Sequence, residues 1–155
     1  MPLKAGDTAP DFTLPDHRGE PQTLSALLND GPVVLFFYPQ ANTPGCTVQA
    51  CRFRDLAGDF EAVGAHVLGI SRDSVQAQAA FADKRGFGYP LLADTDRAVA
   101  ALYGVKGGML GLSPVKRSTF VIGQDGRVIA AYSSETNMNA HADRALEALG
   151  ATQQA

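Results

Sequence analysis

The chain contains only two cysteines, Cys46 and Cys51, and their type and spacing are the first indication of chemistry. The thiolate is the nucleophilic form of cysteine, and a free thiol, with a pKa of about 8.5, is only slightly ionised at neutral pH. A helix N-terminus stabilises an anion by about 0.3–1 kcal/mol. That lowers the pKa of a thiol by roughly one unit at most, so a larger effect would require a nearby guanidinium.

The five-residue spacing of Cys46 and Cys51 constrains what the pair can do. On one helix it gives about 7.5 Å of rise and roughly 140° of rotation, hence about 8–9 Å between the Cα atoms. Disulfide-bonded cysteines rarely exceed about 6.8 Å between Cα atoms. A Cys46–Cys51 bond therefore requires the first turns of the helix to unwind, which suggests a redox switch coupled to local unfolding. The alternative is that both are small core residues near one end of a helix.

Apolar runs that alternate with amphipathic stretches predict the elements that position this pair. Residues 33–38 are consecutively apolar, β-branched or aromatic, which indicates a central strand covered on both faces. Residues 44–63 show helical spacing, with Thr43 as the N-cap and Pro44 in the first turn. The other predicted elements are a short edge strand at 12–14, helical turns at 23–28, strands at 66–70, 90–93, 118–122 and 128–132, and helices at 74–85, 96–103 and 139–149.

Polar and glycine residues mark the ends of the later helices. Asp73 or Ser74 is predicted to cap the helix at 74–85, and Gly86 is predicted to close it. Gly104 and Gly150 are predicted to follow the last residues of the next two helices.

The order of these elements predicts an α/β fold, with a central mixed β-sheet flanked by helices, in one domain that spans residues 1–155. Strands that alternate with helices favour a parallel core, and the terminal hairpin adds antiparallel strands. In such sheets, sites form beyond the carboxyl ends of strands and at helix N-termini. Cys46 follows the strongest strand in the first turn of the longest helix, so we expect the site there.

Composition excludes several classes of protein. The 155 residues are 45% hydrophobic and 19% charged, an ordinary globular balance that excludes a disordered chain. With 13 Lys and Arg against 16 Asp and Glu, the net charge is −3, which argues against nucleic acid as a partner. The apolar run at 33–38 is too short to span a membrane, and no secretory signal is visible at the N-terminus. A cytoplasmic location is expected.

Several segments resemble one known family. Residues 37–47, with the sequence FYPQANTPGCT, resemble the active-site signature P-x-x-x-T-x-x-C of peroxiredoxins. The Pro-Gly-Cys-Thr sequence and the second cysteine five residues on resemble the bacterioferritin comigratory protein subgroup, also called peroxiredoxin Q. The N-terminal segment 6–14 and the later strand pair, at 117–122 and 125–128, are similar to that family in order and spacing.

The resemblance implies a thioredoxin-like fold and an antioxidant thiol peroxidase that reduces hydrogen peroxide and organic (alkyl) hydroperoxides to water and alcohols. By position, Cys46 would be the peroxidatic cysteine, which is oxidised to a sulfenic acid. Cys51 would be the resolving cysteine that condenses with it to a disulfide. Thioredoxin or a similar dithiol would regenerate the enzyme, with no metal or organic cofactor, and the subgroup is often monomeric.

The resemblance also assigns the surroundings of the thiol. Thr43 would hold the thiolate and the peroxide through its hydroxyl, and Arg117 would stabilise the thiolate and the charge on the leaving oxygen. Pro39 would shield the site from water, and backbone N–H groups around Gly45 and Cys46 would complete the cradle.

Three positions depart from the family pattern. Gln40 and Ala41 stand where family members commonly have Lys-Asp or a similar pair, and Gln49 stands where they commonly have glutamate. The loss of that carboxylate could alter how the arginine and the first helical turn are held.

Two other classes of function remain open. One is a thiol–disulfide oxidoreductase on the same fold, although such enzymes usually carry Cys-x-x-Cys. The other is a non-enzymatic redox sensor or binding module that uses the same disulfide as its switch.

Further residues have less specific interpretations. His17, His66 and His141 fit no zinc spacing. The glycine-rich stretch 104–112 follows a predicted helix, so it is a poor phosphate loop, and Met109, Leu110 and Leu112 either line the peroxide entrance, dock a reductant or simply pack down. Arg52 and Arg54 are expected to be solvated helix charges.

Overall fold

The computed structural model describes residues 2–41, 43–107 and 115–153. Its elements, in chain order, are β1 (Thr13–Pro15), β2 (Pro21–Thr23), α1 (Leu24–Leu28), β3 (Val33–Phe37), α2 (Pro44–Asp55), α3 (Ala57–Ala62), β4 (His66–Ser71), α4 (Val75–Arg85), β5 (Leu91–Ala93), α5 (Ala98–Leu102), β6 (Ser118–Ile122), β7 (Val128–Ser133) and α6 (Met138–Gln153). In the described part of the chain, no helix is long and apolar enough to cross a membrane.

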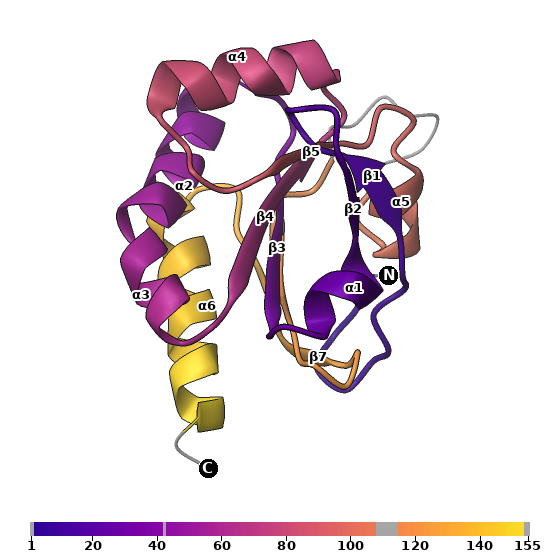
Figure 1. The fold of residues 1–155 in the computed structure, drawn as a ribbon, viewed down its shortest axis with the longest axis vertical. Helices are drawn as coiled ribbons and strands as arrows, with labels where there is room; N and C mark the ends of the chain where they lie inside the picture. The colour runs from indigo at the N-terminus through magenta and orange to yellow at the C-terminus, as the bar shows by residue number, and fades with distance from the viewer. Residues whose placement is uncertain (1, 42, 108–114, 154–155) are drawn as a thin grey trace.

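The main sheet has five strands in the order β5-β4-β3-β6-β7, and β3 lies at its centre (Figure 1). β3 pairs with β4 in parallel and with β6 in antiparallel orientation, and β4 pairs with β5 in parallel. β6 and β7 form the predicted antiparallel hairpin. The mixed sheet expected from the sequence is therefore confirmed. The short strand predicted at 12–14 appears as β1, but it pairs with β2 in a separate two-stranded sheet.

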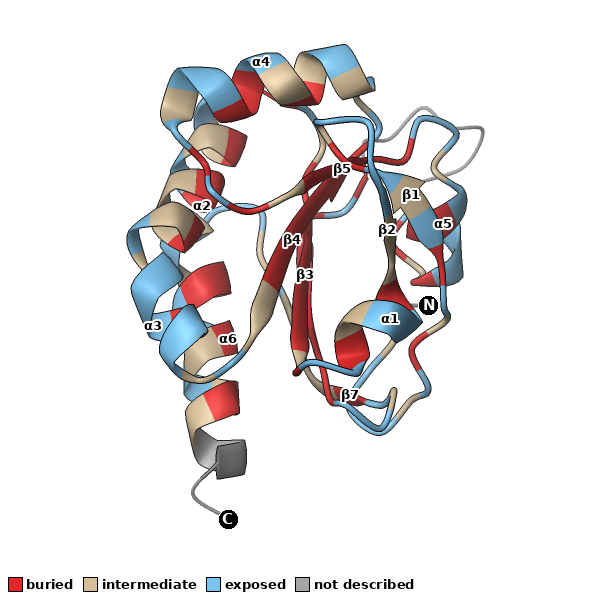
Figure 2. Ribbon diagram, in the orientation of Figure 1, coloured by how far each residue is buried: buried red, intermediate tan, exposed pale blue. Residues whose placement is uncertain are grey.

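Two layers of apolar side chains cover the central strand. Val33, Leu35 and Phe37 contribute to one cluster, which includes residues of α1 and α5. Val34 and Phe36 contribute to the other, which includes residues of α2, α3, α4 and α6. Figure 2 shows β3 buried along its length, between helices whose outer faces are exposed. This explains why residues 33–38 are continuously apolar, since side chains of a strand point alternately to its two faces.

The helix predicted over 44–63 was wrong in one respect, because it is two helices. α2 ends at Asp55, and Leu56 leaves helical geometry with φ −97° and ψ 9° before α3 begins at Ala57. Gly58, a poor helix former, lies in the first turn of α3, which weakens continuity at this point.

Two other helix boundaries differ from the prediction. α5 begins at Ala98, later than expected, because Arg97 takes a left-handed conformation with φ 59°. Asp94 then accepts the N–H groups of Val99 and Ala100, which satisfies the start of the helix. α6 continues to Gln153, so Gly150 lies inside it and does not end it. By contrast, α4 has the predicted caps, Ser74 at its start and Gly86, with φ 70°, at its end.

His141 connects α6 to the sheet. Its ring is buried, and its Nδ1 lies 2.8 Å from the Thr119 hydroxyl while its Nε2 lies 2.9 Å from the Ser134 carbonyl. The carbonyl can only accept, so Nε2–H donates to it and Nδ1 accepts from Thr119. Burial lowers the pKa of His141, the Ser134 carbonyl opposes this, and the positive charge of Arg117 lowers the pKa further. A neutral imidazole therefore fits the fold.

This buried histidine predicts a loss of stability in mild acid. The native pKa of His141 lies below the unfolded value of about 6.5, so the unfolded chain binds more protons in this range. The free energy of unfolding should therefore fall as the pH drops from about 6.5 toward the lower native pKa. His141→Gln should remove that loss while costing about 1 kcal/mol at neutral pH. Urea unfolding across this pH range measures both effects. The control His66→Gln, at the half-buried first residue of β4, should keep the pH dependence that His141 causes. A wild-type-like profile for His141→Gln would contradict the prediction.

Candidate active site

The two cysteines lie on α2, as the sequence predicts. Cys46 is in its first turn, just beyond the carboxyl end of β3, and is only 1% exposed. Cys51 is half-buried farther along the helix, and both residues are free thiols. With α2 intact at both positions, the geometry of a helix keeps their Cα atoms about 8–9 Å apart. A Cys46–Cys51 disulfide therefore cannot form while α2 is folded as in this structure.

Thr43 is the N-cap and Pro44 the first residue of α2, as expected, but the Thr43 side chain does not cap the helix. The Thr43 hydroxyl donates to the Gln40 carbonyl at 2.9 Å, and it makes no side-chain capping bond. The Thr43 carbonyl accepts from both the backbone N–H and the hydroxyl of Thr47. The hydroxyl of Thr43 would have to leave Gln40 before it could donate to a thiolate or a peroxide.

Arg117 places a guanidinium beside the Cys46 thiol from a distant part of the sequence. It immediately precedes β6, and Ser118 pairs with Phe37 in the β3–β6 register, so Arg117 lies at the carboxyl end of β3. Its Nη1 is 3.3 Å from the Sγ of Cys46 and 2.6 Å from the Oε1 of Gln49. Only 6% of the residue is exposed. Arg117 thus places a buried positive charge within hydrogen-bond distance of the Cys46 sulfur.

Gln49 is fully buried and holds Arg117 through its amide oxygen. Its Nε2 has no hydrogen-bond partner among the described residues. The departure from glutamate at this position therefore keeps the acceptor for the arginine and removes a negative charge. The Gln49 amide oxygen therefore holds Arg117 where the family commonly has a carboxylate.

Glu135 and Met138 also border the site, and neither was predicted from the sequence. The backbone N–H of Arg117 donates to Glu135 at 2.8 Å, and the Arg117 Nε lies 3.9 Å from the other carboxylate oxygen. A Cβ added to Gly45 would lie 3.1 Å from the Met138 Cε and 3.3 Å from the Arg117 Nη2, so this position has little room for a side chain. The predicted helix start near 139 was the only signal for these residues, and nothing in the sequence shows that this helix packs against α2.

Pro39 and the region around Cys51 complete the surroundings. Pro39 is half-buried after the end of β3. A shallow depression of about 350 Å³ adjoins the resolving-cysteine candidate and is lined by Thr47, Val48, Cys51, Arg52, Asp55 and Asn139. Arg52 and Arg54 are partly exposed, as expected, and Arg52 also joins α2 to α6 through Asp143 at 2.8 Å.

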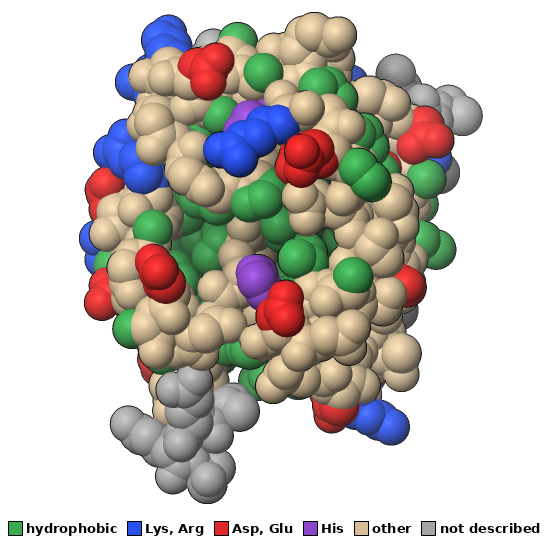
Figure 3. Space-filling model, in the orientation of Figure 1, with side chains coloured by type: hydrophobic (Ala, Val, Ile, Leu, Met, Phe, Trp, Pro, Cys, Tyr) green, Lys and Arg blue, Asp and Glu red, His purple; other side chains and the backbone are tan. Residues whose placement is uncertain are grey.

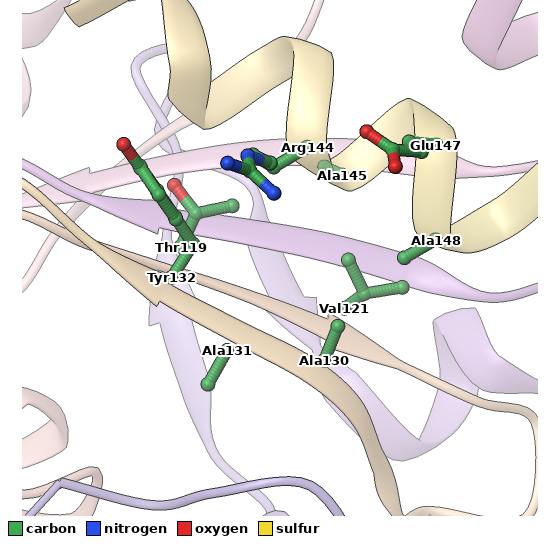
Figure 4. A pocket seen from close by; sticks show the side chains of 9 residues that line it. All are labelled: Thr119, Val121, Ala130, Ala131, Tyr132, Arg144, Ala145, Glu147 and Ala148. Atoms are coloured by element: carbon green, nitrogen blue, oxygen red, sulfur yellow. The ribbon is translucent and has the colours of Figure 1, made fainter. Parts of the chain in front are cut away.

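Two other hollows lie away from Cys46. Figure 3 shows apolar side chains gathered in a hollow over β4, of about 370 Å³, beside the helical layer of α2 and α3. Figure 4 shows a second hollow, of about 300 Å³, between α6 and the β6–β7 hairpin, with Arg144 and Tyr132 at its wall. Neither is lined by Cys46, Arg117 or Gln49, so neither belongs to the candidate site.

The remaining candidates from the sequence lie away from the two thiols or outside the described residues. His17 accepts from the Leu91 N–H and His141 is used by the α6 contacts, so the histidines do not converge with the thiols. Among the described residues, no group of three or more His, Cys, Asp or Glu side chains could hold a metal ion. Met109, Leu110 and Leu112 lie outside the described residues.

A buried thiol and a buried guanidinium meet at the carboxyl edge of a mixed sheet, and the relatives that share this thioredoxin fold are thiol-dependent peroxidases. Residues 5–131 match the AhpC/TSA family, and the chain belongs to that family. The crystal structure of peroxidoxin BcpB from Mycobacterium tuberculosis is similar at 59% identity, with a TM-score of 0.92, over 96% of this chain and 97% of that one.

Two further relatives place the chain within the family. Peroxiredoxin Bcp of Escherichia coli is 40% identical over 144 residues, which cover 90% of this chain and 92% of that protein. A structure of the bacterioferritin comigratory protein of Xanthomonas campestris is 33% identical, with a TM-score of 0.85, over 98% of both chains. The resemblance to the bacterioferritin comigratory protein and peroxiredoxin Q subgroup is confirmed.

The Gln49–Arg117 contact predicts a specific pattern of stability. Gln49→Met removes the 2.6 Å acceptor from a buried guanidinium, so it should lower the free energy of unfolding by about 1–3 kcal/mol. Gln49→Glu keeps an acceptor and should retain stability at neutral pH. Urea unfolding at neutral pH tests this, with Gln76→Met on the exposed face of α4 as the matched control. Equal stability of Gln49→Met and the wild type would show that this contact does not hold Arg117.

Proposed function

We propose that the protein reduces hydrogen peroxide and alkyl hydroperoxides through Cys46. The observation that carries this proposal is the buried Cys46 sulfur, 3.3 Å from the Arg117 guanidinium at the start of α2. The thiolate would attack the terminal peroxide oxygen and break the O–O bond. The sulfur becomes a sulfenic acid, and the leaving oxygen takes up a proton and departs as water or alcohol.

The surrounding groups would stabilise the charge that moves in this step. Arg117 would stabilise the thiolate and then the leaving oxygen, and the backbone N–H groups at Gly45 and Cys46 would add donors at the helix N-terminus. Thr43 would turn its hydroxyl from the Gln40 carbonyl to the bound peroxide. Pro39, half-buried beside this loop, would limit access of water.

Cys51 would resolve the sulfenic acid by forming a disulfide with Cys46 and releasing water. Because the intact helix keeps the residues too far apart, the first turns of α2 would unwind for this step. Thioredoxin or a similar dithiol would then reduce the disulfide by thiol exchange. The depression beside Cys51 would give the reductant access to that sulfur.

Relatives and composition support the wider setting of the proposal. The similar bacterioferritin comigratory protein of Xanthomonas campestris has alkyl peroxide reduction activity, which supports organic hydroperoxides as substrates here. We expect a monomer that acts in the cytoplasm, in protection against oxidative stress, without a metal, nucleic acid or membrane partner.

The proposal predicts the products of a single turnover. After one equivalent of hydrogen peroxide, the wild type should lose both thiols, and its intact mass should fall by the mass of two hydrogen atoms. Cys51→Ser should consume one equivalent and then stall or over-oxidise, and Cys46→Ser should consume none. Thiol titration and intact mass, recorded within seconds at neutral pH, measure these outcomes. Unchanged peroxide turnover in Cys46→Ser would overturn the peroxidase mechanism, and a slow reaction with both thiols retained would favour a redox sensor.

The charge on Arg117 predicts a graded loss of rate. Arg117→Met should lower the second-order rate constant with peroxide by about 10²–10³-fold, because a donor to the developing charge is removed. Arg117→Lys should lose less, because an ammonium restores the charge but not the planar donor geometry. Stopped-flow kinetics measures the rates, and Arg52→Met, which removes a partly exposed ion pair, is the matched control. A loss as large for Arg52→Met as for Arg117→Met would contradict the assignment.

A further inference from the structure

Asp73 holds the loop that leads into α2. It lies between β4 and α4, and its Oδ2 accepts the backbone N–H of Ala41 at 2.7 Å. The same oxygen accepts the Ser71 hydroxyl at 2.6 Å. Ala41 is buried and belongs to the segment between β3 and the N-cap Thr43. A carboxylate from one end of the sheet therefore fixes a backbone group two residues before the start of the proposed peroxide cradle.

A buried network anchors this contact. Gln78, fully buried on α4, donates to the Ser71 hydroxyl at 3.0 Å and to the Leu92 carbonyl at 2.8 Å. Its amide oxygen accepts the Tyr38 hydroxyl at 2.5 Å. Burial raises the pKa of Tyr38 well above its ordinary value, so this hydroxyl remains a donor.

The loop is consequently held at both of its ends. Tyr38 directly follows β3, and Ala41 lies three residues farther on. The Tyr38 hydroxyl donates to Gln78 on α4, and the Ala41 N–H donates to Asp73 in the turn between β4 and α4. The four residues from 38 to 41 thus connect to the network through two separate hydrogen bonds. Unwinding of the first turn of α2 would require this loop to move, and the bond from Asp73 to Ala41 opposes that movement.

We propose that Asp73 is a positioning residue that keeps the segment at 39–41 in the conformation that reacts with peroxide and restrains the opening that leads to the Cys46–Cys51 disulfide. This inference rests on the proposed function of the two cysteines. The residue acts through the Ala41 N–H and through the loop. Loss of the bond lowers the reactivity of the folded site and raises the rate at which the oxidised site opens.

The test separates the two chemical steps. In a Cys51→Ser background, the reaction of Cys46 with hydrogen peroxide is followed alone, and with Cys51 present, quenched intact mass follows disulfide formation from the sulfenic acid. Asp73→Ala should lower the first rate constant about tenfold, because small displacements of positioned groups cost rate. It should raise the second. Asp73→Asn, whose amide oxygen can accept from both Ala41 and Ser71, should stay within about threefold of the wild type in both steps.

The control is Asp83→Ala, which removes an exposed carboxylate on α4 and should leave both rates unchanged. If Asp73→Ala folds poorly, Ser71→Ala is the second variant: it removes the hydroxyl that donates to the carboxylate and accepts from Gln78 and the Asp73 N–H, but it keeps the bond from Ala41 to Asp73. It should shift both rates in the same directions by smaller factors. A fall of both rates together, or equal damage from Asp73→Asn and Asp73→Ala, would overturn the role assigned to this hydrogen bond. Peroxide consumption by Cys46→Ser would instead refute the proposed function itself.

Discussion

A guanidinium buried beside a thiol is the constraint on which the rest of this structure depends. A buried charge is costly without partners, and Arg117 finds them in the Cys46 sulfur and the Gln49 amide oxygen. Those contacts exist only if β6 lies next to β3 in its observed register, because Arg117 directly precedes the residue paired with Phe37. β3 is buried along its length, and helices cover both of its faces. This packing fixes the position of the Arg117 charge at the N-terminal end of α2.

The first turn of α2 and its later turns are held by different contacts. Its later turns are fixed by apolar and polar contacts, since Phe53 stacks on Phe36 with ring centroids 4.2 Å apart and the Ala50 carbonyl accepts the Tyr89 hydroxyl at 2.6 Å. Its first turn depends on the Arg117 contacts and on the preceding loop. The break at Leu56 further limits how far any rearrangement could spread into α3. The proposed unwinding is therefore confined to the end of the helix that carries Cys46, while the rest of α2 remains packed on the sheet.

Local sequence signals predicted much of this fold, and contacts between distant segments account for what they missed. The apolar run of β3, the Ser74 and Gly86 caps of α4 and the β6–β7 hairpin each follow from neighbouring residues. Cys46 was expected from its place after the central strand at the start of the longest helix, whereas Arg117 came from a family resemblance, and the juxtaposition of the two depends on strand register. Glu135 and Met138 had no specific local signature, because Glu135 meets Arg117 from the segment between β7 and α6, and Met138 approaches Gly45 only when α6 packs against α2. The extension of α6 through Gly150 has the same origin, since tertiary packing overrides a modest local propensity.

Neither Gln49 nor Glu135 compensates much of the positive charge of Arg117. Glu135 is the carboxylate that meets this arginine, but 57% of its side chain is exposed and the nearest charged contact is 3.9 Å, so water screens much of its effect. Gln49 supplies an oxygen without a charge, and the Arg117 Nε has no hydrogen-bond partner among the described residues. The Cys46 sulfur, 3.3 Å from Nη1, is the other side-chain group that this guanidinium contacts at hydrogen-bond distance among the described residues. Folding around Arg117 thus places a buried positive charge beside the sulfur of the proposed nucleophile, where it would stabilise the charge that moves during attack on a peroxide.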